Sequence, residues 1–379
     1  AFVVVDPRPP KIVAGPWLQL ANPGEMTVCW ITNVPATGWV EYGEEFSQRA
    51  HASHFGLIDA MTHIHRVTLK GLTPGASVDY RVAAKRVFGI YPICGRFGAS
   101  MHDAKHTFRV PNPAADKVSF VVISDLHDRP DHLPQLTRVT NIKQHDFVVF
   151  NGDTFTYVNN EYQIISHLLR PASELFAAEI PFVLVRGNHE ARGAFARHLP
   201  EYVSLPGGNP YVSSFRIGSA SFLVLDTGED KPDDHIEYFG LADFKTWKAE
   251  EFQMLPSLVG SDSWKSSPFQ ILLAHIPGFD NSEWYPQLNS AGIDLHIAGH
   301  MHCLETRMPP SHANKLGAED RLFPIQIIGG NARGTPDENV VGIITVTPAS
   351  ITMDAIDGYG KKMEQKTFQR VEASDTSVK

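Results

Sequence analysis

Cysteine is scarce in this chain. Its 379 residues include only Cys29, Cys94 and Cys303, and these are widely spaced. Three cysteines allow at most one disulfide, and no Cys-x-x-Cys pair offers the spacing of a structural zinc site. Cys29 lies in a strand-like run, which predicts a buried free thiol. A disulfide framework is therefore excluded as the basis of the fold, while the redox compartment stays open.

Positive charge and long apolar runs are also in short supply. Lysine and arginine number 33 against 42 acidic residues, so the formal net charge is −9. A surface that binds nucleic acid needs an excess of basic residues, so no nucleic-acid partner is expected. No apolar stretch approaches the roughly 20 residues that a membrane helix requires. A small anionic substrate stays possible, because a metal site can make one cleft locally positive. The oligomeric state is left open.

What the chain does have is the composition of a folded protein, with 42% hydrophobic and 20% charged residues. Its length exceeds that of one ordinary core and predicts two domains. The chain opens with Ala1-Phe2-Val3 and no initiator Met, which predicts a trimmed product. A removed export signal and a deliberate truncation explain this equally well.

The first part of the chain is predicted to be all β. Residues 26–32 and 38–43 alternate large apolar with smaller or polar residues, as half-buried strands do. A Pro74-Gly75 turn separates two further alternating runs, and Tyr80 a few residues later is similar to the tyrosine corner of immunoglobulin-like sandwiches. We expect a fibronectin-III-like β-sandwich over 1–112.

The pattern changes after a Pro111-Asn112-Pro113 linker. Short apolar runs over 120–123, 147–150 and 182–185 show no alternation, which indicates strands buried on both faces. Helix-length amphipathic stretches such as 161–178 lie between them. Residues 113–379 are therefore predicted to form a layered α/β domain.

Five apolar runs each end in side chains of the metal-ligand type. Because ligand sites form beyond the carboxyl ends of strands in α/β sheets, these ends are expected to meet at one edge. Each fragment alone is a weak signal, but five in order make coincidence implausible. They deliver Asp125 and His127, Asp153, Asn188 and His189, His275, and His300 and His302.

This donor set suits a pair of divalent or mixed-valence transition-metal ions. Imidazole favours iron, manganese, zinc or nickel over calcium or magnesium. Asp153 is expected to bridge the two ions, because a carboxylate offers one oxygen to each. Asp125, His127 and His302 complete one site, and Asn188, His275 and His300 complete the other. Two divalent ions then leave a surplus of positive charge that attracts a phosphate dianion.

These motifs resemble the calcineurin-like metallophosphoesterase superfamily, whose series is Asp-x-His, Gly-Asp, Gly-Asn-His-(Glu/Asp), His and Gly-His-x-His. The match covers roughly residues 118–335. It implies the ligand assignment above, a four-layer αββα fold, and hydrolysis of a phosphate mono- or diester by a metal-bridging hydroxide. His189 is then the candidate general acid or stabiliser of transition-state charge, and Asp153 the second catalytic residue.

The N-terminal part resembles purple acid phosphatases in Trp30-Ile31-Thr32 and in residues 65–75, and this architecture implies a secreted or periplasmic enzyme. Two departures stand out. Purple enzymes have Gly where this chain has His127, and Tyr where it has Thr156, so we expect no tyrosinate-to-iron colour and a different metal environment. The substrate-facing histidines of that family are replaced by Glu283, Trp284 and Tyr285, so substrate specificity does not carry over.

The remaining candidates have ordinary alternatives. Arg186, and Arg333 in a glycine-rich run, are possible phosphate contacts, but Arg186 equally suits an ion pair and Arg333 a structural turn. Asn188 and His189 are further candidates for substrate contact. Glu190 is expected to orient a ligand from behind. His296, between Leu295 and Ile297, is expected in the core.

Two other functions remain open at this point. One is a binding or adhesion protein whose phosphoesterase domain is silent. The other is a nucleotide-specific phosphodiesterase in which aromatic side chains stack a base; the candidates are Phe155, Tyr157, Trp284 and Tyr285. A covalent serine hydrolase is disfavoured because no Gly-x-Ser-x-Gly motif exists.

Overall fold

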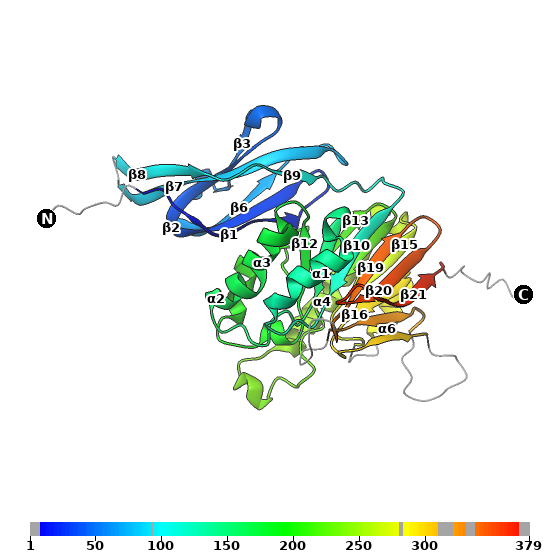
Figure 1. Cartoon of the computed structure of the whole chain (residues 1–379). Coiled ribbons are helices and arrows are strands. Elements are labelled where there is room, and N and C mark those ends of the chain that lie inside the picture. The colour runs from blue at the N-terminus through cyan, green and yellow to red at the C-terminus, as the bar shows by residue number, and fades with distance from the viewer. Residues whose placement is uncertain (1–7, 92–93, 280–282, 310–320, 331–337, 371–379) are drawn as a thin grey trace, which may run out of the picture.

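A computed structural model describes residues 8–91, 94–279, 283–309, 321–330 and 338–370. Figure 1 shows a β-rich N-terminal part lying over one end of a larger α/β part. Among the described residues, no helix is both long enough and apolar enough to cross a membrane.

The N-terminal part is a small β-sandwich organised around one long strand, β2 (Met26–Tyr42). Its first half pairs with β1 (Ile12–Leu20) and β6 (Thr62–Leu69), and its second half pairs with β3 (Gln48–Ala50) and β7 (Ser77–Tyr91). A register irregularity between Ile31 and Ala36 marks the change of partner. Strands β8 (Cys94–His102) and β9 (His106–Arg109) both pair with β7, and a short hairpin joins β4 (Ser53–His54) to β5 (Leu57–Ile58).

The alternation in the sequence explains which residues fill this sandwich. Leu18, Val28, Trp30, Val40 and Tyr80 point inward and pack as one buried cluster. Cys29 points to the opposite face of β2 and is a buried free thiol, as predicted. Burial raises its pKa to about 11, so it stays protonated at neutral pH.

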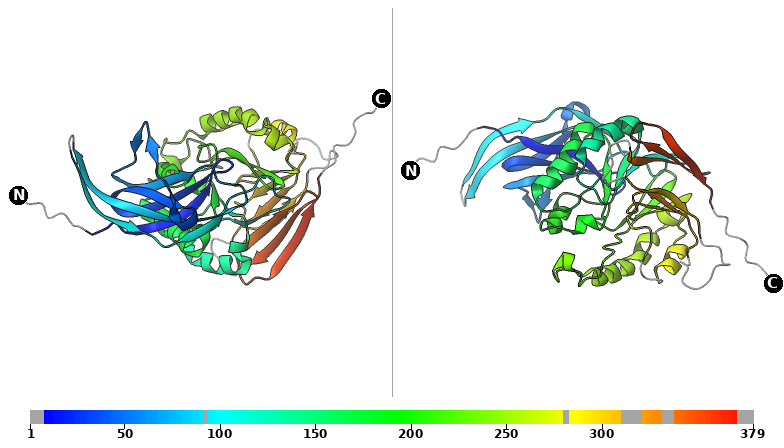
Figure 2. Two further views of the ribbon diagram at one scale, coloured as in Figure 1. Left: turned by 90° about the horizontal axis from the view of Figure 1, so that it is seen from above. Right: turned by 60° about the horizontal axis from the view of Figure 1, so that its bottom comes forward.

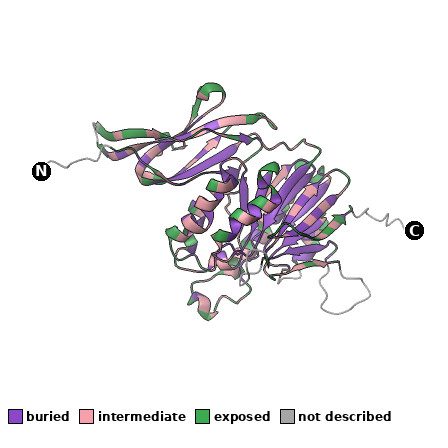
Figure 3. Ribbon diagram, viewed as in Figure 1, coloured by how far each residue is buried: buried purple, intermediate pink, exposed green. Residues whose placement is uncertain are grey.

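The second part contains two sheets packed face to face. In the first, β10 (Val118–Ile123), β11 (Phe147–Asn151) and β12 (Phe182–Val185) run parallel, and β19 (Val340–Val346), β20 (Ile351–Asp357) and β21 (Lys362–Phe368) continue it in antiparallel pairs. The second has the order β13 (Ser213–Ile217), β14 (Ala220–Val224), β15 (Phe269–Leu273), β16 (Leu295–Ala298), β18 (Ile325–Ile328) and β17 (Leu304–Arg307). The apolar runs without alternation are the inner strands, buried on both faces (Figure 3).

Helices cover the outer faces of both sheets, which makes the four layers that the resemblance implied. The first sheet is covered by α1 (Leu133–Thr140) and by a helical stretch that joins α2 (Glu161–Gln163), η4 (Ile164–Leu169), α3 (Arg170–Ala172) and η5 (Ser173–Ala177). The second is covered by α4 (Phe244–Val259), α5 (Asp262–Lys265) and α6 (Trp284–Ser290). In Figure 2 the two sheets lie between these helical layers.

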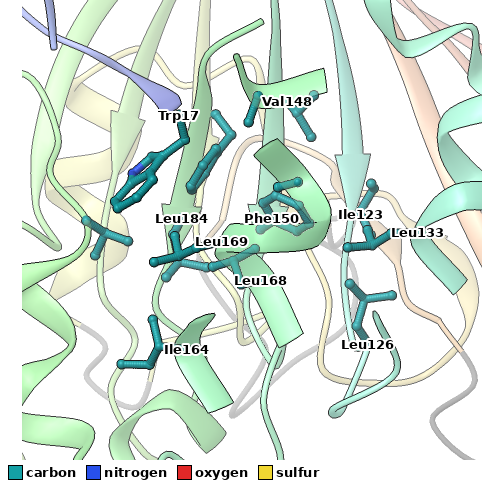
Figure 4. Close-up of a cluster of buried hydrophobic side chains, with 14 of the residues drawn as sticks. Trp17, Ile123, Leu126, Leu133, Val148, Phe150, Ile164, Leu168, Leu169 and Leu184 are labelled. Carbon is teal, nitrogen blue, oxygen red and sulfur yellow. The ribbon is translucent and has the colours of Figure 1, made fainter. Parts of the chain in front are cut away.

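The two parts share both a sheet and a core. Strand β1 of the sandwich pairs in parallel with β12 at Gln19 and Phe182, so the first sheet runs on into the N-terminal part. Trp17 of β1 is fully buried beside Leu168 and Leu184 of the α/β part (Figure 4). The sequence analysis predicted a proline-rich linker but not this continuity.

Tyr80 corrects one expectation. A tyrosine corner places the hydroxyl on backbone a few residues upstream. Here the Tyr80 hydroxyl donates instead to the carbonyl of Ala178, 2.7 Å away in the α/β part. Tyr80 therefore ties the sandwich to its neighbour rather than closing a loop within it.

Candidate metal centre

The predicted ligand residues lie in tight loops with an unusual backbone. Five of the seven have positive φ: Asp125 (57°), His127 (45°), Asp153 (52°), His300 (69°) and His302 (51°). Such values are uncommon outside glycine and cost free energy, and they concentrate at functional sites. The loops hold one another in place, because Asp125 N–H donates to the Gly152 carbonyl and His127 N–H to the Asp153 carbonyl.

The strand ends meet, although they come from two sheets rather than one edge. Strands β10, β11 and β12 of the first sheet deliver Asp125, Asp153 and Asn188, while β15 and β16 of the second deliver the C-terminal histidines. Three overlapping groups of side chains have their ligand atoms within 4.8 Å of one another. They are Asp125, His127 and His302; His127, Asp153 and His189; and Asp153, His275 and His300.

Asp153 occupies the centre of this cluster. Its Oδ2 lies 3.1 Å from His275 Nε2 and 3.6 Å from His127 Nε2, so one carboxylate faces both predicted sites. Its Oδ1 accepts the backbone N–H of His189 at 3.0 Å. Gly187 has to be glycine, because a Cβ there would stand 2.4 Å from that Oδ1. The carboxylate of Asp153 therefore lies between the two groups of predicted ligands.

The histidines turn one nitrogen toward the cluster. His275 Nδ1 lies 2.7 Å from the Asn151 carbonyl and His302 Nδ1 lies 2.8 Å from the Gly330 carbonyl. A carbonyl only accepts, so Nδ1 carries a proton in both rings and Nε2 is the nitrogen that faces the ligand cluster. The Nε2 atom of His127 is buried without a hydrogen-bond partner among the described residues, whereas that of His275 faces Asp153 Oδ2. Imidazole nitrogens beside carboxylates fit transition-metal ligation.

Burial and mutual charge distort the titration of these groups in opposite directions. Burial raises the pKa of Asp125 to about 6. Burial opposes ionisation of His275 as well, but the Asp153 carboxylate outweighs it and raises the pKa of His275 to about 10. Burial opposes ionisation of Asp153 too, but the nearby His275 holds the pKa of Asp153 well below its usual range. Carboxylates this deeply buried need nearby positive charge, and two bound cations would supply it.

Comparison with known proteins agrees with this geometry. The model of the calcineurin-like phosphoesterase family matches residues 118–304, and that of the purple acid phosphatase N-terminal domain matches residues 15–93. The chain combines a purple acid phosphatase N-terminal domain with a calcineurin-like phosphoesterase domain. The fold of this family implies a dinuclear metal centre, and the donor set described above fits one.

Individual relatives share part or most of the chain. Acid phosphatase type 7 of Mus musculus is 30% identical over 222 residues, which cover 55% of this chain and 47% of the relative. Purple acid phosphatase 18 of Arabidopsis thaliana is 22% identical over 374 residues, covering 87% and 77%. The chain spans about half the length of the acid phosphatase type 7 sequence. The solved purple acid phosphatase PPD1 from Lupinus luteus seeds shares the fold, with a TM-score of 0.69 at 16% identity over 97% of this chain and 76% of that one.

Within the phosphoesterase domain, Glu190 fastens the loop that carries Asp153. It is fully buried, and its carboxylate accepts four backbone N–H groups. These belong to Asp153 (2.8 Å), Thr154 (2.6 Å), Phe155 (3.2 Å) and Gly187 (2.8 Å). Burial, with the nearby Asp153, raises the pKa of Glu190 to about 7. Glu190 thus lies behind the ligands, where it was expected.

Sequence analysis missed Arg192. Its guanidinium is nearly buried, binds Glu229 through two hydrogen bonds of 2.7 and 2.8 Å, and lies 3.0 Å from His189 Nε2. Glu229 also accepts the Tyr238 hydroxyl. No signal in the sequence marks this network, because Glu229 follows Arg192 by 37 residues and lies outside every motif.

The ring of His189 is fixed on both sides. Its Nδ1 lies 2.8 Å from the Thr156 carbonyl, so Nδ1 carries the proton, and Nε2 accepts from Arg192. Its ring centroid is 4.6 Å from that of His127. The structure therefore places His189 beside His127 and Asp153, with a cationic partner that the sequence did not predict.

The other candidates are placed differently. Arg186 pairs with Asp226 and stacks over Tyr211 at 4.2 Å, which agrees with the ion-pair alternative. Arg333 lies outside the described residues. Tyr157 is 38% exposed, a hydrogen bond to Glu237 raises its pKa, and its ring centroid lies 6.2 Å from that of His189. His296 is buried and packs near Phe279, as a core residue.

Proposed function

We propose that this chain hydrolyses phosphate esters at a dinuclear metal centre. The observation that carries the proposal is the position of the Asp153 carboxylate between two groups of ligand atoms that share it. When bound, two adjacent metal ions lower the pKa of water and stabilise charge on the attacking and leaving oxygens. The ligands are proposed to be Asp125, His127, Asp153, Asn188, His275, His300 and His302.

The protein's own residues would hold and orient the substrate. Arg192 lies beside His189 and bonds its Nε2, and Glu229 keeps the guanidinium in that orientation. With Nδ1 bonded to the Thr156 carbonyl and Nε2 accepting from Arg192, the His189 ring offers no Nε2 proton to donate in this arrangement. This favours stabilisation of transition-state charge by His189 and Arg192 together over proton donation by His189.

Two structural observations bear on the alternative functions. Phe155 and Tyr285 are 0% and 3% exposed and pack in the core, so neither is available to stack a base. His127 keeps a buried Nε2 atom without a hydrogen-bond partner among the described residues of the cluster, which favours an intact metal centre over a decayed one.

The test is hydrolysis of p-nitrophenyl phosphate and bis-p-nitrophenyl phosphate, with elemental analysis of the same sample before and after chelation. We expect chelator-sensitive turnover, and the preferred ester assigns the enzyme as a mono- or diesterase. Asp153→Ala should lose metal and turnover together, whereas His189→Ala should keep metal and lose most turnover. Asp131→Asn is the control, because that side chain is 71% exposed and belongs to none of the ligand groups. Two metals and full activity in Asp153→Ala would disprove the assignment.

We also propose that the enzyme works outside the cytosol. The support is the two-domain architecture alone, which is an argument by analogy. Cell fractionation with activity measured in each fraction tests it, and activity confined to the cytosol would reject it.

A further inference from the structure

A large cavity adjoins the metal centre. It has a volume of about 790 Å³, within the range of small-molecule sites. Helix α4 forms one side, the loop after β14 a second, and a third is formed by Ile276, Gly278, Phe279, Glu283 and Trp284. None of its lining residues is one of the seven predicted metal ligands.

Three contacts connect the cavity to the centre. Asp230 lines it, and its Oδ2 lies 3.8 Å from His300 Nε2. Ile276 lines it and directly follows His275 in the chain. Glu229 lines it while holding Arg192 against His189. A substrate whose phosphate lies among the histidines would therefore have its alcohol portion at the mouth of this cavity.

One wall of the cavity is aromatic. Phe252 packs edge-on against Trp284, with centroids 5.2 Å apart, and Phe279 stacks on Trp284 at 5.1 Å. Phe252 and Phe279 are only partly buried, so ring surface is available to a ligand. Aromatic faces and edges prefer other rings beyond the area that they bury.

The polar groups of the cavity favour a hydrogen-bonding ring over a second anion. Three lysines line the cavity, against six acidic residues among its described lining residues, and Lys231 pairs with Asp230 at 3.1 Å. Glu251 is 1% exposed; its Oε1 accepts the Asp226 N–H, and its Oε2 has no hydrogen-bond partner among the described residues. Burial raises the pKa of Glu251 well above its usual value, so this carboxyl is protonated and can donate.

We infer that the cavity binds the leaving group of the substrate and that this group carries an aromatic ring. The inference rests on the proposed phosphoesterase function and narrows it to aromatic phosphate esters. The ring lies against Phe252 and Phe279 while the phosphate occupies the metal centre.

The test compares benzyl phosphate with ethyl phosphate, because both release a primary alcohol and differ in the ring. We expect kcat/KM for benzyl phosphate to exceed that for ethyl phosphate at least about tenfold. Phe252→Ala should lower this ratio about tenfold, and Phe252→Leu, which keeps apolar packing against Trp284, should lower it less. Glu250 is exposed and does not line the cavity, so Glu250→Ala should leave the ratio unchanged. The same panel includes phosphotyrosine, an aryl ester, and adenosine 5′-monophosphate, a nucleoside ester. The ester whose kcat/KM falls more in Phe252→Ala identifies which kind of ring the cavity binds.

A binding measurement separates this inference from the proposed function. Calorimetry of the metal-loaded protein with benzylphosphonate and ethylphosphonate reports the cavity without turnover. Tighter binding of benzylphosphonate that is lost in Phe252→Ala supports the cavity even if neither ester is hydrolysed. Hydrolysis of both esters with a ratio near one, or a ratio that both Phe252 variants retain, overturns it.

Discussion

Arg192 offers the sharpest test of how the chain builds its site. We consider Arg192→Met, which keeps an apolar stem and removes the guanidinium. Arg192 and Glu229 are 6% and 0% exposed and meet through two hydrogen bonds, so the substitution leaves a carboxylate buried without its main partner.

The magnitude follows from what remains around Glu229. Removing one partner of a buried ion pair costs about 3–5 kcal/mol. Tyr238 still donates to Glu229, and Lys231 Nζ lies 3.5 Å away, so we expect the lower end, about 3 kcal/mol in the free energy of unfolding. His189 also loses the donor on Nε2, and kcat/KM should fall about a hundredfold.

Urea unfolding and steady-state kinetics on the metal-loaded protein check both numbers. A double variant tests the origin of the loss, because adding Glu229→Gln to Arg192→Met removes the unpaired buried charge. The double variant should recover at least about half of the lost stability but little of the activity. Metal content should be unchanged, because Arg192 is in none of the ligand groups. An Arg192→Met protein of wild-type stability, or a double variant no more stable than the single one, would refute the reasoning.

Three further predictions follow from buried polar groups. Glu190→Gln sets an amide donor against backbone N–H groups, so metal affinity should fall about 10–100-fold by titration calorimetry. Burial lowers the pKa of His65 to about 4, so the unfolded state binds the extra proton. Wild type should lose up to about 3 kcal/mol as the pH falls from 6.5 to 4, and His65→Gln should escape that loss in urea unfolding. Tyr80→Phe leaves the buried Ala178 carbonyl unpaired and should lower the free energy of unfolding by about 1–2 kcal/mol, whereas an unchanged value would deny its role at the join.

Much of the fold and of the ligand cluster was accessible from the sequence, because both depend on local patterns. Runs such as 147–150 have no alternation, so they could only be strands buried on both faces, and the polar residues after them had to lie at strand ends. The helical stretch over 161–177 appeared where its amphipathic pattern predicted. The irregularity in β2 falls at Pro35, between Ile31 and Ala36, and a proline within a strand marks such a break, but the change of partner carries no comparable signal.

What the sequence did not reveal depends on contacts between distant segments. Arg192 finds Glu229, Tyr80 finds Ala178, and β1 adds to β12 through a single residue pair. In each case a side chain or a strand edge meets a partner from a distant segment, and the two come together only when the layers of the fold pack. The same applies to Arg186, whose partner Asp226 lies on the other sheet's loop.

The positive φ of the ligand loops has a consequence for redesign of the metal preference. Asp, Asn and His are the non-glycine residues that best tolerate the left-handed region. At Asp125, His127, Asp153, His300 and His302, the backbone therefore restricts the choice of donor before any metal binds. A softer set with Cys, or a longer carboxylate with Glu, would add backbone strain of about 1 kcal/mol or more at each position. Changing the metal that this centre selects thus requires rebuilding the loops, whereas substitution at Asn188 or His275, which lie outside that region, is the less costly route.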